Sequence, residues 1–208
     1  MPRTMDRDAR KNQLAEAVWQ VILDQGISAV SVRTVAERAG VAVGSLRHVF
    51  PSRAELVQFS AELMVQRATD RLYATYPKAA SGDPHARALA LIREVLPITP
   101  DTRAEFEVNL ALLAERAAVP ELHRVRGEAH QRLAGLCRRV VDMLTSEPGT
   151  PAVLAKAQRL HALIDGLAFH LFHQPPEADS AWALDIIRAE LREIAGHSAD
   201  GGGAQRSG

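Results

Sequence analysis

Cysteine and aromatic residues are scarce in this sequence. Cys137 is the only cysteine among 208 residues, which excludes an intrachain disulfide and favours a reducing cytoplasm as the compartment. Aromatic residues make up 4% of the chain although hydrophobic residues make up 47%, so the apolar side chains are chiefly leucine, valine, isoleucine and alanine. This composition is typical of helices packed on helices.

Long apolar runs and an overall excess of one charge are also missing. No stretch approaches 18 uncharged apolar residues, and the N-terminus is charged, so we expect neither a membrane span nor a secretory signal. The formal net charge is zero, but residues 1–53 carry a balance of +3 and the remaining residues a balance of −3. A basic N-terminal segment on an acidic remainder favours a polyanionic partner at that end.

Proline, glycine and capping residues divide the sequence into helical segments. Because the sequence has no strand-like alternation and no long repeat, it predicts an all-α fold of nine helices. A capping box from Ser52 to Glu55 opens one long helix, and Asp-Pro or Thr-Pro pairs open three others. The expected helices span about 6–25, 32–39, 43–49, 53–76, 84–97, 100–117, 120–145, 151–173 and 180–196.

The segment Val32–Pro51, VRTVAERAGVAVGSLRHVFP, carries a helix-turn-helix pattern. Gly40 stands at the turn, where left-handed backbone is needed, and Ala36 lies four residues earlier, where a larger side chain would separate the two helices. The positions expected to pack this pair onto the first helix are Val35, Ala39, Val41, Leu46 and Val49. The pattern predicts a DNA-reading unit, and an ordinary helical hairpin inside a bundle is the alternative.

With these residues in place, the sequence resembles the TetR family of transcriptional regulators. The resemblance covers the first helix and Ser31 to about Leu56, including AERAGVAVGSL and HVFPSRAEL, and extends to the length and the nine-helix plan. The segment LHALIDGLAFHLF, Leu160–Phe172, resembles the eighth helix of a subgroup with a betaine-regulator-like C-terminal half. The resemblance to the TetR family implies a DNA-binding domain over 1–52 and a ligand-binding and dimerisation domain over 53–197. The Gly-rich tail, 198–208, is expected to be disordered.

The resemblance implies a ligand-responsive homodimer, most often a repressor, that reads double-stranded DNA. Its second short helix would enter the major groove, Arg33 would contact guanine, and Arg53 would replace a phosphate-binding lysine of the family. The expected DNA contacts are Ser31, Arg33, Thr34, Ala42, Val43, Gly44, Ser45, Arg47, His48 and Arg53. Arg33 as a solvated surface residue is the alternative.

Arg47 and Val49 depart from the family pattern, which usually has tyrosine at the first position and often has it at the second. Arginine brings a full charge and a longer reach than a tyrosine hydroxyl. Arg47 is therefore expected to hold a phosphate or to read a base, and the sequence leaves both alternatives open.

The resemblance also implies a pocket among the fourth to eighth helices for a small-molecule effector of unknown identity. Its inward-facing candidates are Phe106, Asn109, Leu110, Leu113, Leu136, Cys137, Val140, His161 and Phe169. For the apolar members, plain core packing is the alternative; Asn109 and His161 interrupt otherwise apolar stretches and can also be ordinary core or surface residues.

The eighth and ninth expected helices each carry an apolar face, and in the resembling family these helices pair with their copies. The expected dimer contacts are Leu160, Ile164, Leu167, Leu171, Trp182, Ile187 and Leu191. Gly166 and Ala168 would permit close approach or relieve crowding within one subunit. A dimer of this kind reads two half-sites about 34 Å apart, or multiples of that distance, so a palindromic operator is expected.

Histidine and aspartate raise a metal alternative near the eighth helix. His161 and Asp165 have ligand spacing, with His170 and His173 nearby, but the sequence lacks a zinc-protease motif and no cysteine joins the set. We therefore expect no metal and no cofactor. An enzyme built on a helical bundle is one alternative, but the sequence has no phosphate loop, nucleophile elbow or Cys-His arrangement to support it. An interaction protein with a vestigial helix-turn-helix is a further alternative.

Overall fold

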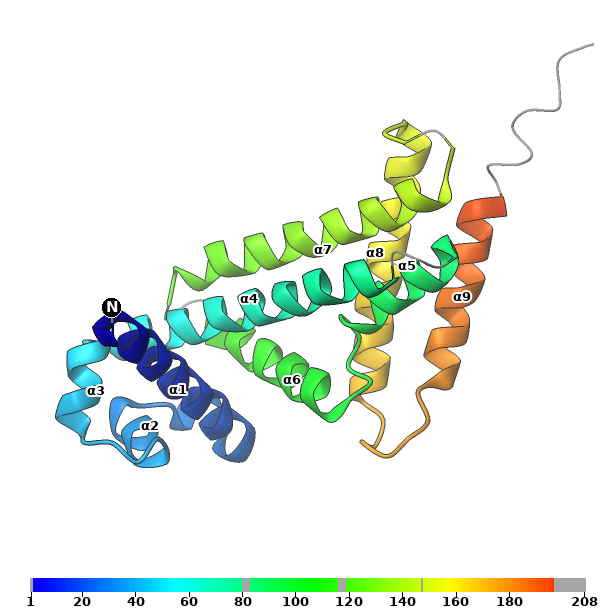
Figure 1. Ribbon diagram of the computed structural model, residues 1–208. Coiled ribbons are helices and arrows are strands. Elements are labelled where there is room, and N and C mark those ends of the chain that lie inside the picture. The colour runs from blue at the N-terminus through cyan, green and yellow to red at the C-terminus, as the bar shows by residue number, and fades with distance from the viewer. Residues whose placement is uncertain (1, 80–82, 116–118, 147, 197–208) are drawn as a thin grey trace, which may run out of the picture. The chain divides into compact units, whose positions relative to one another are not determined.

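The computed structural model describes residues 2–79, 83–115, 119–146 and 148–196, and of residues 2–6 and 77–79 the backbone alone. Within these ranges the chain forms nine α-helices and a short 3-10 turn, which confirms the predicted all-α fold (Figure 1). The predicted tail, 198–208, lies outside the described residues. The elements are α1 (Pro2–Gln25), η1 (Ile27–Ala29), α2 (Val32–Arg38), α3 (Val43–Val49), α4 (Arg53–Ala79), α5 (Pro84–Arg93), α6 (Pro100–Ala114), α7 (Leu122–Leu144), α8 (Pro151–Phe172) and α9 (Ala181–Gly196).

The end of α5 differs from the prediction, because the helix stops at Arg93 instead of Pro97. Tight turns follow, with the Val95 N–H donating to the Ile92 carbonyl at 3.1 Å and the Ile98 N–H to the Leu96 carbonyl at 2.8 Å. Leu96 is fully buried although the helix has ended. The apolar periodicity therefore continues past the helix end, which is why the sequence pattern placed the end too late.

The chain divides into two compact units by its internal contacts. Unit 1 consists of Met1–Thr69 and Ala104–Ala129, and unit 2 of Asp70–Arg103 and His130–Gly208. Helices α4, α6 and α7 each contribute residues to both units.

Unit 1 buries one hydrophobic core beneath the helix-turn-helix. Leu14, Val18 and Val21 of α1 are fully buried and belong to the same cluster as Val35 of α2 and Leu46 of α3. The cluster continues into α4, α6, α7 and the residues just before α7 with Leu56, Val57, Ala61, Met64, Val108, Leu112, Val119, Leu122 and Val125. The packing that supports the helix-turn-helix therefore extends well beyond residue 53.

The turn between α2 and α3 has the geometry that its sequence predicts. Gly40 has φ +66°, the left-handed region that glycine adopts without steric cost. The Val41 N–H donates to the Ala36 carbonyl at 2.9 Å, and Ala36 is fully buried. A small residue at position 36 thus lets the chain fold back over α2.

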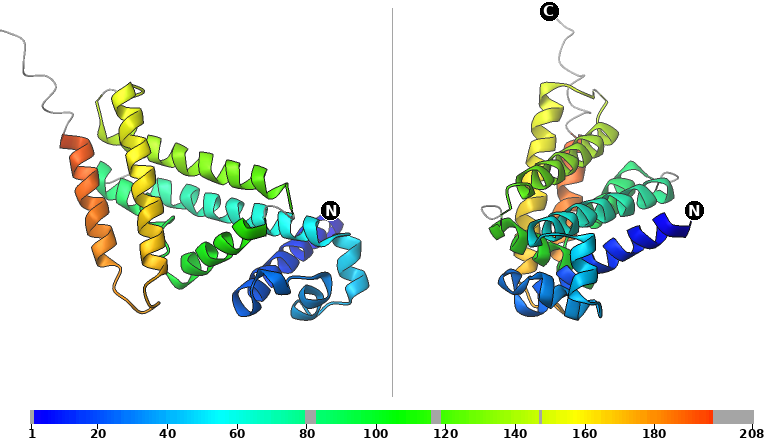
Figure 2. Two further views of the ribbon diagram at one scale, coloured as in Figure 1. Left: turned by 180° about the vertical axis from the view of Figure 1, so that it is seen from behind. Right: turned by 90° about the vertical axis from the view of Figure 1, so that its left-hand side faces the viewer.

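In unit 2, α5 and α8 both pack on α9, and the two views in Figures 1 and 2 show α8 and α9 side by side. Arg159 on α8 pairs with Glu190 at 2.8 Å and Glu193 at 2.9 Å on α9. Lys156 donates to the Ile194 carbonyl at 2.9 Å. These contacts fix which faces of α8 and α9 meet within one chain.

Arg103 attaches the first turn of α6 to the end of α8. Its guanidinium donates to the carbonyls of Leu171 at 2.9 Å, Phe172 at 2.6 Å and Gln174 at 2.5 Å, and lies 5.4 Å from the centre of the Phe172 ring. The last carbonyls of a helix have no hydrogen-bond partner within that helix, and a cation placed there also interacts favourably with the negative end of the helix dipole. Arg103 therefore caps α8 from another helix.

Candidate nucleic-acid interface

Helix α3 is held on one face and exposed on the other. Leu46 is fully buried and Phe50, directly after the helix, is 4% exposed with its ring 5.2 Å from that of Phe59. The predicted reading positions are all exposed: Ala42, Val43, Gly44, Ser45, Arg47 and His48. The core thus anchors α3 without using any of the side chains predicted to face DNA.

Gly44 occupies a position where the fold does not require glycine. Its φ is not positive, and a Cβ atom built there would have no atom of the chain within 4 Å. A side chain at position 44 is therefore compatible with the folded chain. The small size of Gly44 makes room on the outer surface of α3.

Ser31 and Thr34 use their hydroxyl groups to start α2. The Thr34 N–H donates to Ser31 Oγ at 3.1 Å, and the Ser31 N–H donates to Thr34 Oγ1 at 2.9 Å, which is a capping box. Thr34 Oγ1 also donates to the Ala29 carbonyl at 2.7 Å. Both residues fix the beginning of α2, and Arg33 lies in its exposed first turn.

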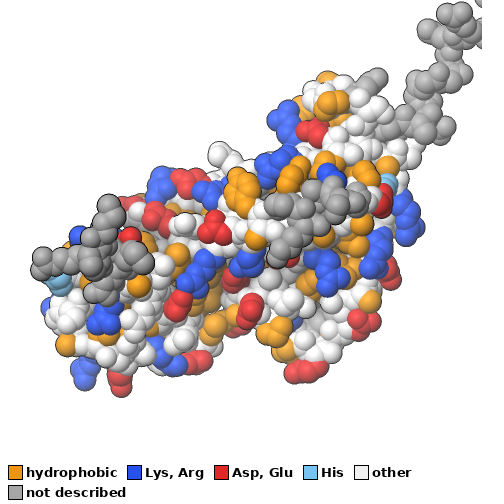
Figure 3. Space-filling view, viewed as in Figure 1, with side chains coloured by type: hydrophobic (Ala, Val, Ile, Leu, Met, Phe, Trp, Pro, Cys, Tyr) orange, Lys and Arg blue, Asp and Glu red, His pale blue; other side chains and the backbone are white. Residues whose placement is uncertain are grey.

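The arginines of unit 1 fall into two groups. Arg33 and Arg47 are exposed and form no hydrogen bond or ion pair within the part of the chain that the structure describes. Arg38, in contrast, pairs with Asp24 at 2.5 Å. On the face seen in Figure 3, Lys and Arg side chains are interspersed with Asp and Glu. The guanidinium of Arg38 is therefore already engaged within the chain, whereas those of Arg33 and Arg47 are not engaged by any described residue.

Arg53 belongs to the paired group. Its Nε donates to the Val30 carbonyl at 2.7 Å, its Nη2 to the Ile27 carbonyl at 3.3 Å, and its Nη1 pairs with Glu115 at 2.8 Å. The side chain of Arg53 is 32% exposed and that of Glu115 is 17% exposed. The partner Glu115 was not a predicted site residue, because it lies 62 positions away and no local pattern points to it.

The predicted pocket residues lie in different environments. In unit 1, Phe106, Leu110 and Leu113 are half-buried, whereas Asn109 is exposed. In unit 2, Leu136, Cys137 and Val140 belong to the core, His161 is 8% exposed, and Phe169 is 48% exposed.

His161 is the centre of a small polar cluster in unit 2. Its ring centre lies 4.7 Å from that of His130, and its Nε2 lies 3.6 Å from Asp165 Oδ2, too far for a good hydrogen bond.

Burial, with a smaller effect of the Asp165 charge, raises the pKa of the Cys137 thiol to about 12. Cys137 therefore stays protonated at neutral pH, which makes it a poor nucleophile and a poor metal ligand. Among the residues described, no group of three or more His, Cys, Asp or Glu could hold a metal ion.

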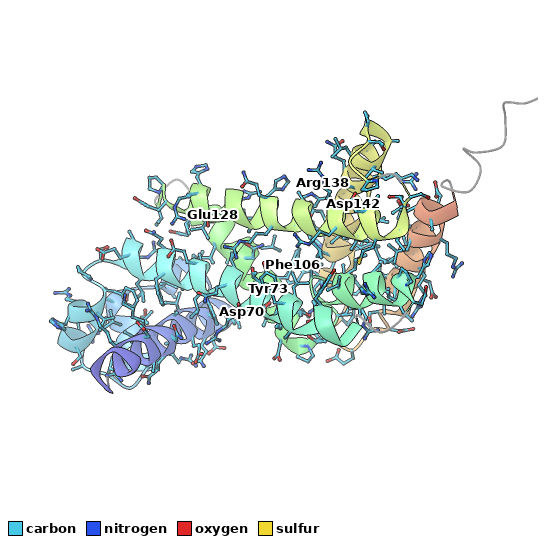
Figure 4. All side chains as sticks on the ribbon, turned by 45° about the horizontal axis from the view of Figure 1, so that its top comes forward. Asp70, Tyr73, Phe106, Glu128, Arg138 and Asp142 are labelled. Carbon is cyan, nitrogen blue, oxygen red and sulfur yellow. The ribbon has the colours of Figure 1, made fainter. Side chains whose placement is uncertain are left out.

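Within the described part of unit 2, the buried Nε2 of His161 and the buried Oδ1 of Asp142 have no hydrogen-bond partner. Figure 4 shows Asp142 and Arg138 on the C-terminal half of α7. Buried polar atoms are normally paired, so each such exception calls for an explanation. Asp142 was not among the predicted residues, because a lone aspartate in a charged helix has no distinctive sequence pattern.

The residues predicted for the dimer interface lie largely inside unit 2. Leu160, Ile164, Leu167, Leu171, Ile187 and Leu191 are each at most 4% exposed. Trp182 is half-buried and donates to Gln174 Oε1 at 3.2 Å. The apolar stripe of each helix is thus already covered within one chain. The exposed apolar or small residues on the opposite faces are Ala155, Ala162, Gly166 and Phe169 of α8, with Ile186 and Ala189 of α9.

Two family models match the chain. Residues 14–58 match the model of bacterial regulatory proteins of the tetR family, and residues 84–196 match the C-terminal domain of the BetI-type transcriptional repressor. The second match alone covers more than half of the chain. The chain belongs to the TetR family. Its predicted family and its betaine-regulator-like C-terminal half are both confirmed, and the TetR family consists of transcriptional regulators rather than enzymes.

Individual relatives agree with this assignment. The chain is 31% identical over 199 residues to the HTH-type transcriptional regulator PksA of Bacillus subtilis, covering 93% of this chain and 94% of that protein. A transcriptional regulator from Rhodococcus sp. Rha1 has a similar structure, with a TM-score of 0.77, 26% identity, and coverage of 90% of this chain and 97% of that one.

A regulator from Saccharomonospora viridis, solved in complex with choline, shares the fold at a TM-score of 0.70 and 22% identity, covering 91% of this chain and 97% of that one. Among the described residues, no helix is long and apolar enough to cross a membrane.

Proposed function

We propose that this TetR-family regulator is a cytoplasmic repressor that binds a palindromic operator as a homodimer and is released by a small molecule. The observation that carries the proposal is the exposed face of α3, which presents Arg47 beside the small residues Ala42, Gly44 and Ser45 while Leu46 anchors the helix. An α-helix presented in this way fits the major groove of B-DNA, and its N-terminal residues face the base edges.

The proposed contacts divide by chemistry. Arg33 has a free guanidinium that can donate two parallel hydrogen bonds to a guanine, the commonest base-specific contact. Val43, 39% exposed, and Ala42 suit the methyl group of thymine, while Ser45 and His48 can reach a base edge or the backbone. Ser31 and Thr34 contribute by fixing the first turn of α2, from which Arg33 projects.

Operator binding is tested with the DNA that flanks the gene for this protein. Fluorescence anisotropy with overlapping labelled duplexes should reveal one palindromic segment bound tightly at moderate salt, with unrelated duplexes bound at least about a thousandfold more weakly. Equal affinity for all duplexes, or no binding at low salt, would reject a sequence-specific regulator.

Arg47→Ala should weaken operator binding and reduce the slope of log K against log salt by about 0.9, if Arg47 neutralises one phosphate. Arg38→Ala is the matched control, because Arg38 is already paired with Asp24, and it should leave the slope unchanged. An unchanged slope in Arg47→Ala together with relaxed preference at one base pair would instead place Arg47 on a base.

The homodimer is proposed to form through the outward faces of α8 and α9. Phe169 and Ile186 are 48% and 40% exposed in the single chain, and the neighbouring positions Ala162, Gly166 and Ala189 are small. Small residues let two helices approach closely, and exposed apolar side chains that lie near one another are typical of an interaction surface. Residues such as Leu160 and Ile187 support this surface from inside unit 2.

The effector is proposed to bind in the BetI-type C-terminal domain, where Asp142 Oδ1 and His161 Nε2 are buried without a hydrogen bond to any described residue. Because a structural relative holds choline, choline is the first probe. At 100 times its dissociation constant a ligand adds about 2.7 kcal/mol of stability, so choline should raise the melting temperature and release the operator. The same titration with betaine and with tetramethylammonium tests the quaternary ammonium group, and no shift with any of the three would exclude this ligand class.

A further inference from the structure

Arg53 lies at the first position of α4, where the TetR resemblance predicts a contact to DNA phosphate. A phosphate contact needs N–H groups directed outward and a positive charge that is not already neutralised. In this chain each of the three guanidinium nitrogens donates one internal hydrogen bond, two to backbone carbonyls and one to Glu115, and the Glu115 carboxylate pairs with its charge. These contacts connect α4 to the residues just before α2 and to Glu115.

The two carbonyls that Arg53 binds belong to one turn. Ile27 begins the 3-10 turn η1, and Val30 follows its end, with the Val30 N–H donating to the Ile27 carbonyl at 3.1 Å. The next residue is Ser31, which caps α2. By holding both ends of this turn, Arg53 fixes where α2 begins and hence where Arg33 stands.

Glu115 holds the guanidinium in this position. Its side chain is more buried than that of Arg53, and the 2.8 Å contact from Nη1 leaves the planar fork directed at the turn. We infer that Arg53 is a positioning residue for the DNA-reading helices, oriented by Glu115, and not a phosphate contact. The inference rests on the proposed DNA binding for its operator readout, but the position of the turn can be measured without DNA.

The decisive measurement is the salt dependence of operator affinity for Arg53→Ala and Arg53→Lys. A positioning role predicts that both variants bind about three- to tenfold more weakly with the wild-type salt slope, because lysine has one nitrogen and cannot serve two carbonyls and a carboxylate in a fixed plane. A phosphate role predicts that Arg53→Lys keeps its affinity and that Arg53→Ala loses about 0.9 of slope, which would overturn the inference.

Glu115→Ala is a second test, because the two possible roles of Glu115 predict changes of opposite sign in operator affinity. If Glu115 orients a support, its removal weakens operator binding; if Glu115 only competes with phosphate for Arg53, its removal strengthens binding and the inference fails. Glu128→Ala is the matched control, since Glu128 pairs with Arg124 at 2.6 Å in the same unit, and it should leave affinity unchanged.

Hydrogen exchange in the full chain without DNA makes the test independent of the proposed function. In Arg53→Lys the amides of residues 30–35 should exchange faster than in wild type, while those of α9 keep their protection. Unchanged exchange at residues 30–35 would overturn the inference even if operator binding fails. Thermal unfolding of each variant identifies any that does not fold, and Arg53→Lys, which keeps the charge and most of the volume, serves if Arg53→Ala does not.

Discussion

Phe169→Glu should convert the proposed dimer to a monomer and lower operator affinity at least about a hundredfold. Each head of a dimer binds its half-site at the effective concentration set by the other head, and a monomer loses that gain. A carboxylate at position 169 would have to be desolvated against the partner chain, and Phe169 is 48% exposed in the single chain, so the fold itself should tolerate it. Sedimentation or light scattering measures the mass, and anisotropy measures the affinity.

Leu23→Glu is the control for this experiment. Leu23 is also a large apolar residue, 36% exposed, but it lies on α1 in unit 1. Its variant should remain dimeric, and Ile186→Glu on α9 should behave like Phe169→Glu. A dimeric Phe169→Glu with wild-type affinity would reject the outward face of α8 as the interface.

Gly44→Ala should separate folding from DNA binding. Replacement of glycine by alanine in a helix stabilises it by up to about 1 kcal/mol, and the added Cβ would contact no atom of this chain. If the backbone of α3 approaches the DNA closely at this point, the same methyl group obstructs that approach and costs on the order of tenfold in operator affinity. The melting temperature should therefore stay or rise while binding falls.

Gly127→Ala provides the matched comparison. Gly127 is an exposed glycine of α7 in the same unit, and a Cβ there would also have no atom within 4 Å. Its variant should bind the operator normally. If Gly44→Ala also binds normally, the glycine is not there for close approach to DNA, and α3 would lie farther from the bases than proposed.

The helix-turn-helix could be predicted from the sequence because its determinants are local. Gly40, Ala36 and Leu46 lie within eleven residues, and each requirement, a left-handed turn, a small contact and a buried anchor, selects a residue type. The helix count follows from caps and prolines in the same way. Local requirements of this kind are written in consecutive residues and need no knowledge of the fold.

The orientation of α8 and α9 could not be read in the same way. Their apolar periodicity identifies one stripe on each helix, but a stripe can face a partner chain or its own core, and here Leu160, Ile164 and Ile187 face the core. The other face, with Gly166 and Phe169, lacks a strong apolar repeat. Which face is covered depends on α5 and on how α8 and α9 pair, and both are tertiary facts.

Contacts between distant residues account for the other differences. In the sequence, Arg53 resembles a surface arginine, and only the folded chain brings Glu115 and the Val30 carbonyl into contact with it. In the same way, His161 lies beside His130 of another helix only in the folded chain. The charge of a residue can be read from the sequence, but whether that charge is already paired depends on the folded chain. For this reason residue type alone did not separate Arg33 from Arg53.

The burial of Cys137 makes this chain well suited to site-directed spectroscopy. The native thiol is fully buried with a pKa raised to about 12, so thiol-reactive probes at neutral pH should leave it unmodified in the folded protein. A cysteine introduced at an exposed position such as Gln20 on α1 would then be the only reactive thiol, with no need to remove the native one. Paired spin labels in the proposed dimer would report the distance between its two heads, with and without effector.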